Sequence, residues 1–422
     1  MIMAISPSPA SNTKPPLLSA AEALSHLLKN PEPVEGHESV PTQDALGRVL
    51  AEDIVSTVDV PPLDNTSMDG YAVATQDIPQ PGVTLKVDQR IPAGSIGEPL
   101  KPKTIARIFT GAPIPPGADA VVMQEDCTTE AQSDLVQINS IPSMGQWIRR
   151  RGEDLSVGKV ALSAGTVLRP QHLGVAASAG YAELPVKRRV RVAAFFTGDE
   201  LSLPGEPLKP GGIYNSNRDT LLGLIRSLGC VGTDYGIVPD RLEATRQALR
   251  TASEDHDLII TSGGVSVGEE DHIKPAVHAE GRLDLWQIGI KPGKPLAFGA
   301  VRKQNQTDSE AWFIGLPGNP VSSFVTFILF VRPFILKLQG RSDFTPPSFL
   351  VRADFDWSKP DRRNEFLRVK LNAVGGLDLF PNQSSGVLTS AAWGDGLIDC
   401  PAGQGFKKGD MVRYIPFSGL LY

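Results

Sequence analysis

A short polar segment, residues 261–272, combines residue types that suit phosphate and metal chemistry. It reads TSGGVSVGEEDH and places three glycines, two serines and three acids directly after the apolar run DLII. Glycine allows the backbone to approach another group closely. Carboxylates in such a segment can hold a cation, move a proton or begin a helix. The segment by itself leaves these three interpretations open.

Three further loops follow other expected strands, and of the four loops three are acidic and two are glycine-rich. They are TGDEL at 197–201, Pro239–Asp240 and GLPGNPVS at 315–322. In an open α/β sheet, ligands bind beyond the carboxyl ends of the strands. Glycine loops with exposed N–H groups bind phosphate, and clustered carboxylates hold Mg²⁺ that phosphate shares. We therefore predict a phosphate-bearing ligand with a divalent cation, although the chain has no P-loop motif and no GxGxxG after the first strand.

Ordinary structural roles compete with this interpretation. Asp240 and Glu243 have the spacing of a capping box, so Asp240 can be a helix cap. Asp271 can begin the helix DHIKPAVHAE in the same way. Asn319-Pro320 is a good helix start without any ligand. The functional interpretation is favoured because these residues all fall at one edge of one predicted sheet.

Two basic segments have a similar ambiguity. Lys291 and Lys294 flank a Pro-Gly turn in IKPGKP and can form an anion clamp or a solvated turn. The run RRRGED at 149–154 can be a salt-linked surface or an anion site with a catalytic carboxylate. A further acidic segment, DNTSMDGYAV at 64–73, runs into an expected strand.

The elements that would position these loops alternate between strand and helix over residues 190–340. Apolar runs such as VRVAAFFT and DLII read as strands, and NSNRDTLLGLIRSLG reads as a helix that Gly229 ends. Such alternation predicts a central three-layer α/β/α domain with a mostly parallel sheet. The apolar run FVTFILFV at 324–331 is too short to span a membrane and ends at Arg332 and Pro333, so we expect it to form part of a buried helix.

The remaining segments predict a multidomain α/β protein. Ser19 and Glu22 have capping-box spacing at the start of the first helix, and residues 40–57 read as a second helix. We expect a disordered tail at 1–16, a mixed N-terminal helical and linker domain at 17–57 and 158–189, and a β-rich domain at 58–157. The α/β domain at 190–340 follows. Residues 341–422 predict a small β-barrel or sandwich, of which we favour the barrel.

Composition narrows the class of protein. The chain has 422 residues, a net charge of -6 and a pI near 5.6, so the basic face of a nucleic-acid binder is not expected. Three scattered cysteines indicate neither a disulfide framework nor a metal knuckle. The N-terminus lacks the apolar core of a signal peptide. We expect a cytoplasmic protein that binds neither nucleic acid nor membrane.

Eight motifs, taken in order, resemble one family. They are PPLDNTSMDGYAV, FTGAPIPPGADAVVMQE, IRRRGEDL, FFTGDEL, TSGGVSVGEEDH, IKPGKPLAFG, GLPGNPVS and SSGVLTSAAWGDGLI. From about residue 17 to the C-terminus the chain resembles the molybdopterin molybdenumtransferases, the MoeA-like molybdenum insertases. The resemblance implies insertion of molybdate into adenylated molybdopterin, with Mg²⁺ as cofactor and release of AMP. It also implies a homodimer, with a molybdopterin adenylyltransferase and apo-molybdoenzymes as partners.

The resemblance also implies roles for individual residues. Asp240, Asp271 and Glu200 would hold Mg²⁺ and take part in catalysis, and Asp69 and Asp154 would be an acid–base pair whose pKa values the surroundings raise. The residues implied for adenylated molybdopterin are Thr110, Gly198, Asp199, Ser262, Gly263, Gly264, Ser266, Gly268, Pro317, Gly318 and Asn319. Those implied for molybdate are Lys291, Lys294, Ser322, Arg368 and Ser385.

The chain departs from the family pattern in one place and matches it less sharply in another. Gln287 follows Trp286 where family members often carry a lysine, and the EFLR segment makes Arg368 the less sharply matched assignment. Two other functions therefore stay open at this point. One is a molybdopterin adenylyltransferase, which the α/β domain alone resembles. The other is a catalytically weak dimeric scaffold of the same fold.

Overall fold

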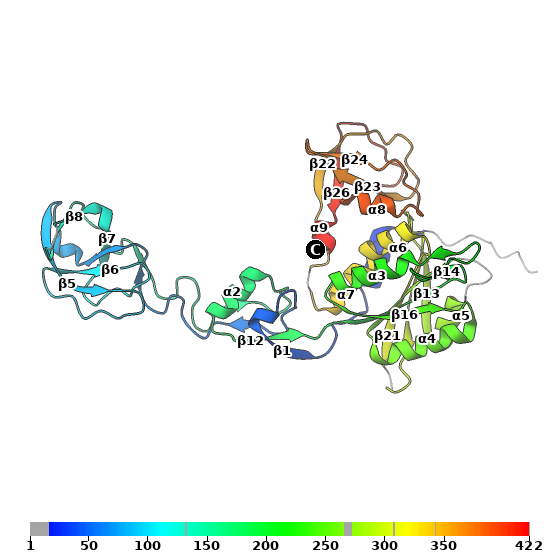
Figure 1. Ribbon diagram of the computed structural model, residues 1–422, viewed down its shortest axis with the longest axis horizontal. Helices are drawn as coiled ribbons and strands as arrows, with labels where there is room; N and C mark the ends of the chain where they lie inside the picture. The colour runs from blue at the N-terminus through cyan, green and yellow to red at the C-terminus, as the bar shows by residue number, and fades with distance from the viewer. Residues whose placement is uncertain (1–16, 131–132, 266–271, 307–308, 342, 422) are drawn as a thin grey trace, which may run out of the picture. The chain divides into compact units, whose positions relative to one another are not determined.

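The computed structural model describes residues 17–130, 133–265, 272–306, 309–341 and 343–421 (Figure 1). The chain forms two compact units, and each is described by itself. One unit is Met1–His37 with Lys187–Tyr422, and the other is Glu38–Val186.

The first unit contains a six-stranded sheet in the order β16-β13-β17-β21-β20-β18. Neighbouring strands from β16 to β21 are parallel, and only β20 runs against both its neighbours. The prediction of a mostly parallel sheet is therefore confirmed. The strands are β13 (Arg191–Thr197), β16 (Val231–Val238), β17 (Leu258–Ser262), β18 (Gly281–Gln287), β20 (Pro295–Arg302) and β21 (Glu310–Leu316), with a small parallel pair, β14 (Leu201–Ser202) and β15 (Ile213–Tyr214), beside them.

Helices cover both faces of this sheet because successive strand residues point to opposite sides. In β13, Val192, Ala194 and Phe196 join a core that includes helix α3, whereas Ala193 and Phe195 join a core that includes α4 and α5. Figure 1 shows α3 and α7 on one side of the sheet and α4 and α5 on the other. The helices are α3 (Ser216–Ser227), α4 (Leu242–Asp255) and α5 (Ile273–Glu280).

A long apolar helix passes through the core of this domain. It consists of α6 (Pro320–Thr326), the π-turn η4 (Phe327–Val331) and α7 (Arg332–Leu338). By length and composition Pro320–Leu338 would suffice to span a membrane, but 89% of its apolar window is buried inside the protein, as in a core helix. The prediction that the apolar run is part of a buried helix is confirmed, and the helix continues past Arg332 and Pro333 to Leu338. The π-turn, which ends at Val331, changes the hydrogen-bond pattern just before Pro333, which has no N–H to donate.

The first helix packs in the α/β core. Helix α1 (Ala20–Leu27) begins with the predicted capping box, in which Ser19 Oγ accepts from Glu22 N at 3.2 Å and Glu22 Oε2 accepts from Ser19 N at 2.8 Å. Its buried residues Ala23 and Leu27 join the core of the α/β domain. The helix therefore lies in the first unit, while residues 38–57, which we expected beside it, lie in the second.

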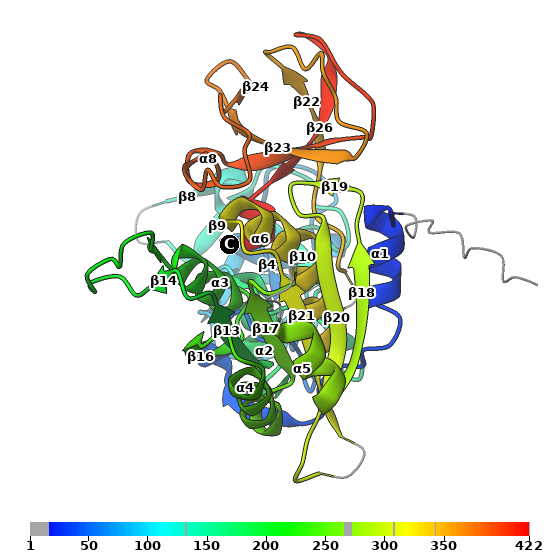
Figure 2. The ribbon, with the colours of Figure 1, turned by 90° about the vertical axis from the view of Figure 1, so that its right-hand side faces the viewer.

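A closed five-stranded barrel follows the α/β domain, as predicted. Strand β23 pairs with both β24 and β25, which closes the ring β23-β24-β22-β26-β25. A two-residue strand from the α/β domain, β19 (Ile290–Lys291), adds to β23 in parallel, so the IKPGKP turn is tied to the barrel (Figure 2). The barrel elements are β22 (Phe349–Ala353), β23 (Asn364–Leu371), β24 (Gly376–Leu379), α8 (Thr389–Trp393), β25 (Gly396–Cys400), β26 (Met411–Pro416) and α9 (Ser418–Leu421).

The second unit carries the predicted β-rich domain and a smaller domain around α2. The β-rich sheet has the order β7-β4-β6-β5-β9-β8, and β3 pairs with β10 beside it. The smaller domain joins β1 to β12 and β2 to β11. The elements are β1 (His37–Pro41), β2 (Ile54–Val55), β3 (Asn65–Thr66), β4 (Gly70–Val73), β5 (Val83–Ile91), β6 (Thr104–Ile108), β7 (Ala120–Met123), β8 (Cys127–Thr129), β9 (Leu135–Ile138), β10 (Ile148–Arg149), β11 (Val160–Leu162), α2 (Pro170–Ser178) and β12 (Glu183–Lys187).

The helix predicted over residues 40–57 is absent. This segment forms the end of β1, a 3₁₀ turn at Thr42–Asp44 and β2 instead. Its backbone forms hydrogen bonds with a segment that is distant in the sequence: Gly47 N donates to Leu168 O at 2.8 Å, and Leu50 N donates to Thr166 O at 3.0 Å. Pairing of this kind overrides local helix propensity.

Candidate functional site

A cavity of about 670 Å³ lies at the carboxyl ends of β13, β17 and β21. It is closed on another side by the IKPGKP turn and by the barrel segment 383–385. Its position agrees with the rule that open α/β sheets bind ligands beyond the carboxyl ends of their strands. The predicted residues that line it are Gly198, Glu200, Asp240, Gly263, Gly264, Lys291, Lys294, Pro317, Gly318, Asn319, Ser322 and Ser385.

Two glycines in this wall permit close packing of the protein against itself. Gly263 has a φ of +101°, and a Cβ there would lie 2.6 Å from the carbonyl oxygen of Thr197 on the neighbouring strand. Gly293 has a φ of +111°, and a Cβ there would meet the Thr326 hydroxyl. Both positions exclude other residues through backbone conformation as well as space. The close approach predicted for Gly263 is thus, first of all, an approach to Thr197.

Asn217 joins the two glycine-containing loops. Its side-chain amide donates to Ser262 Oγ at 2.8 Å and to the carbonyl oxygen of Gly318 at 2.7 Å. Ser262 is buried and donates in turn to the carbonyl oxygen of Pro317 at 3.1 Å. Ser262 therefore braces the site instead of lining it. Asn217 carries no motif signal in the sequence beyond its place in the first turn of α3.

The predicted acidic residues of this domain differ in their position relative to the cavity. Glu200 and Asp240 line the cavity, whereas Asp199 is exposed and does not. Asp240 is not a helix cap, because α4 is preceded by Arg241 at the cap position. Ser266, Gly268 and Asp271 lie outside the described residues. Within the described ranges no group of three His, Cys, Asp or Glu side chains forms a metal site, so the Mg²⁺ site stays a prediction.

The basic wall of the cavity contains Lys291, Lys294 and Arg363. The first two are predicted residues, and Arg363 is an addition from the structure. Lys294 is exposed. Lys291 and Arg363 both form ion pairs with carboxylates of the barrel.

Arg368 does not reach the cavity. Its side chain is 1% exposed inside the barrel and donates to Ser390 Oγ, to the carbonyl oxygen of Phe366 and to that of Ser384 at 3.0–3.3 Å. Burial lowers the pKa of Arg368 to about 10. The residue supports the segment of Ser384 and Ser385, so its assignment as a direct molybdate ligand is corrected to a supporting role.

Replacing Arg368 with methionine should destabilise the protein. Two carbonyl groups and a hydroxyl would lose their buried donor, at a cost of about 2–3 kcal/mol in the free energy of unfolding. Denaturant unfolding of R368M measures this. The matched control is R413M, since Arg413 lies in the same barrel with its side chain 49% exposed. Equal stability of the two variants would contradict the supporting role.

Comparison with known proteins agrees with this arrangement. Residues 18–180 match the MoeA N-terminal region (domain I and II), residues 193–337 match a probable molybdopterin binding domain, and residues 351–417 match the MoeA C-terminal region (domain IV). Together these matches cover most of the chain. The chain belongs to the MoeA family.

Individual relatives extend over nearly the whole chain. A molybdopterin molybdenumtransferase of Haemophilus influenzae is 42% identical over 83% of this chain and 85% of its own length. One from Nostoc sp. is 35% identical over 93% of this chain and 91% of its own length. The crystal structure of a molybdopterin biosynthesis moeA protein from Pyrococcus horikoshii superposes with a TM-score of 0.83 at 30% identity, covering 95% of this chain and all of that one.

In the second unit, most of which the MoeA N-terminal match covers, Asp69 lies beside Thr110. Asp69 Oδ1 accepts from both the backbone N and the hydroxyl of Thr110 at 2.7 Å. These two hydrogen bonds, the backbone one first, lower the pKa of Asp69. The expectation of a raised pKa is therefore wrong for Asp69. Its side chain is an ionised carboxylate at neutral pH. Such a group accepts a proton or a hydrogen bond.

Replacing Thr110 with valine should raise the pKa of Asp69. The variant loses the hydroxyl donor but keeps the backbone N–H, so the pKa should rise only part of the way to its ordinary value. Because the pKa of Asp69 is lower in the folded protein than in the unfolded chain, the contact stabilises the folded protein at pH values above the unfolded pKa. This stabilisation is lost as the pH falls through the pKa of the folded protein. NMR titration of the Asp69 carboxyl carbon measures the shift. An unchanged pKa in T110V would show that the hydroxyl plays no part.

The RRRGED run is largely a salt-linked surface. Arg150 pairs with Asp64 and Arg151 with Asp59, both at 2.6 Å. Asp154 is exposed, and the described residues offer its side chain no hydrogen bond to Asp69. The structure thus brings Asp69 to Thr110 but gives no contact that joins Asp154 to them.

The departure at Gln287 does not touch the cavity. Gln287 is the last residue of β18 and is not among the lining residues. Its neighbour Trp286 packs against Phe298 with ring centres 5.3 Å apart. The three cations of the wall, Lys291, Lys294 and Arg363, therefore come from positions other than 287.

Proposed function

We propose that this protein inserts molybdate into adenylated molybdopterin, in a Mg²⁺-dependent reaction that releases AMP and yields molybdenum cofactor. The supporting observation is that one cavity of a MoeA-family chain combines glycine loops, two carboxylates and three cations. The substrate pair needs this combination, because an adenylate carries phosphate and molybdate is a tetrahedral dianion.

Each part of the cavity has a chemical role in this proposal. The turns around Gly264 and Gly318, which line the cavity, would offer backbone N–H groups to phosphate oxygens, whereas the Gly263 N–H is already donated to the carbonyl oxygen of Leu316. Lys294, Ser322 and Ser385 offer a cation and two hydroxyls to the oxyanion. This set of donors is typical of sites that bind a small tetrahedral anion.

The donors also fit a bound cation. Glu200 and Asp240 supply the oxygen ligands that Mg²⁺ prefers, and Asp271, by its match to the family motif, would add a third. Bound Mg²⁺ would neutralise phosphate charge and polarise the phosphoryl oxygens. Glu200 and Asp240 would hold it, and their own charge would otherwise repel both substrates.

Asp69 contributes as an acceptor in this proposal. Molybdenum–oxo groups leave as water when thiolates replace them, so the reaction needs groups that exchange protons. Asp69, kept ionised by Thr110, is suited to take a proton first and return it later. Asp154 would be its partner. We further propose a cytoplasmic homodimer that receives its substrate from a molybdopterin adenylyltransferase and passes its product to apo-molybdoenzymes.

The deciding experiment measures AMP release from adenylated molybdopterin by the purified protein, with Mg²⁺, with and without molybdate. Molybdate-dependent AMP release, with a product that restores an apo-molybdoenzyme, is the expected result. Pyrophosphate release from ATP and molybdopterin would indicate an adenylyltransferase instead. Binding of the adenylate without any AMP would leave only the scaffold role. Light scattering of the same sample reports the oligomeric state.

A further inference from the structure

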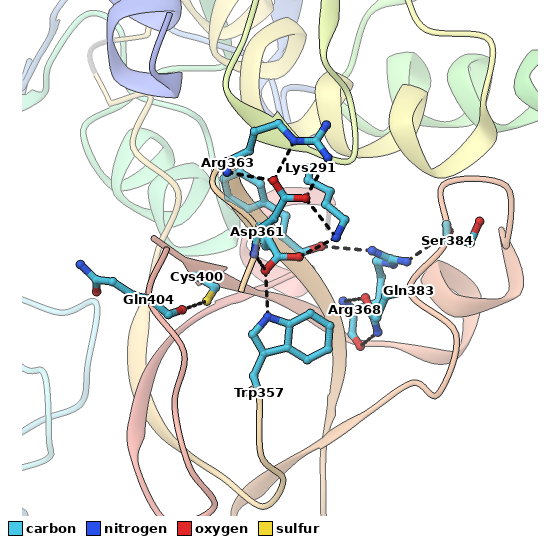
Figure 3. Close-up of polar contacts among 11 residues, drawn as sticks. Lys291, Trp357, Asp361, Arg363, Arg368, Gln383, Ser384, Cys400 and Gln404 are labelled. Carbon is cyan, nitrogen blue, oxygen red and sulfur yellow. Dashed lines mark hydrogen bonds and ion pairs between the residues drawn. The ribbon is translucent and has the colours of Figure 1, made fainter. Parts of the chain in front are cut away.

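Four charged residues meet where the cavity touches the barrel: Lys291, Asp361, Arg363 and Glu365. We call them the junction cluster, and Figure 3 labels Lys291, Asp361 and Arg363. Lys291 and Arg363 line the cavity, whereas Asp361 and Glu365 contact these cations without lining it. The two positive and two negative formal charges cancel. The basic wall of the cavity is therefore much less positive than its side chains suggest.

Glu365 is the buried member of the cluster, at 2% exposure. Its Oε1 accepts from Lys291 Nζ at 3.0 Å, and its Oε2 accepts from Trp357 Nε1 and from the backbone N of Asp361, both at 2.8 Å. A buried carboxylate needs a compensating charge and filled hydrogen bonds. Lys291 supplies that charge. Much of the positive charge of Lys291 is therefore neutralised by Glu365 and is not available to a ligand in the cavity.

Asp361 compensates Arg363 in the same way. The pair is bidentate, with Nε–Oδ1 and Nη2–Oδ2 distances of 3.0 Å, and the backbone N of Arg363 also donates to Oδ1. Lys291 Nζ lies 3.4 Å from Asp361 Oδ2. The Arg363 guanidinium is the main reason that the pKa of Asp361 is far below its usual range. Asp361 thus carries a full negative charge at neutral pH, close to both cations.

Lys294 is the third cation of the wall and differs from the other two. Among the residues that the structure describes, it makes no ion pair or hydrogen bond through its side chain. Within the part of the chain that the structure describes, a dianion that enters the cavity therefore meets one uncompensated cation, Lys294, and two compensated ones.

We propose that Asp361 and Glu365 limit the affinity of the cavity for oxyanions, by compensating Lys291 and Arg363 from the side away from the ligand. This inference rests on the proposed function, which makes an oxyanion one of the substrates. It assigns the two carboxylates a role in setting affinity, although neither touches the ligand. Sulfate carries the same charge as molybdate, so a fully cationic wall would be filled by common dianions. A compensated wall binds such ions weakly and stays open.

The test is the binding of oxyanions to the full-length protein and its D361N variant, measured by calorimetry with molybdate and with sulfate. Removing one negative charge a few ångströms from a dianion should tighten binding of both by about tenfold at low ionic strength. The gain should shrink as salt is added. A merely structural defect would weaken binding, so the direction of the change is informative.

The barrel offers a matched control in Asp354. It forms the same bidentate pair with Arg352, at 2.8 and 3.1 Å, and neither residue lines the cavity. D354N should bind oxyanions as the unaltered protein does. D361E, which keeps the charge, should also stay close to the unaltered affinity. E365Q removes the second compensating charge and should tighten binding as D361N does, which provides a second test if D361N fails to fold.

Weaker or unchanged oxyanion binding in folded D361N and E365Q would overturn the inference, and weaker binding would show that the carboxylates are needed to position the cations. Failure of the proposed function looks different. If the protein inserts no molybdate but D361N binds sulfate and molybdate more tightly, the result supports the inference and contradicts the proposed function. A protein that inserts molybdate while D361N binds it more weakly would do the reverse.

Discussion

Replacing Asp240 with asparagine should lower molybdate-dependent AMP release by about 100-fold, equivalent to about 2.7 kcal/mol of activation free energy. Asp240 and Glu200 are the carboxylates that line the cavity among the described residues. Asparagine keeps the size of the side chain but removes the charge that would hold Mg²⁺. The measurement is AMP release over a Mg²⁺ titration, in which D240N should also need more Mg²⁺ than the unaltered protein.

The control for this variant is D219N. Asp219 lies on α3 of the same domain, and its side chain is 60% exposed and does not line the cavity. D219N should release AMP at the unaltered rate with the unaltered Mg²⁺ requirement. If D240N matches it, Asp240 is not a metal ligand and the metal part of the proposal fails.

Replacing Gly263 with alanine should cost about 3 kcal/mol of unfolding free energy and distort the cavity wall. The added methyl carbon would lie 2.6 Å from the carbonyl oxygen of Thr197 and 3.1 Å from its hydroxyl, at a φ of +101°. A backbone carbonyl inside a sheet cannot move aside as a flexible side chain can. The variant should therefore show a lower denaturation midpoint together with weaker binding of the adenylate.

Gly223 provides a control of opposite sign. It lies inside helix α3, and a Cβ there would meet nothing within 4 Å. G223A should raise the unfolding free energy by about 0.5–1 kcal/mol, because alanine loses less conformational freedom in a helix than glycine does. If both alanine variants were equally stable, the argument from close approach at Gly263 would be wrong.

The place of the site could be predicted from the sequence because it depends on a rule of topology. Parallel strands end at the same edge of a sheet, so loops that follow different strands come together there. Gly198, Asp240 and Gly318 are far apart in the chain but meet in one cavity for this reason. The sequence shows glycines and acids concentrated in the loops after the strands, and the alternation of strands and helices predicts that these loops meet at one edge of the sheet.

The choice between two arginines of the barrel could not be predicted in this way. Arg363 stands just before β23 and lines the cavity, whereas Arg368 lies within β23 and points into the barrel. Side chains alternate between the two faces of a strand, so a shift of one residue in register exchanges them. The register of β23 is set by its pairing with β24, β25 and the short strand β19, none of which is adjacent to it in the motif.

The sequence by itself determined the local features of this protein and its family. Short-range features need only neighbouring residues, and the Ser19–Glu22 capping box and the alternation of the α/β domain are of this kind. Tertiary structure alone decided which charges are compensated. Lys291 and Glu365 are 74 positions apart, and their contact exists because β19 joins the barrel beside β23. Electrostatic interaction depends on distance in space, and the folded backbone sets that distance.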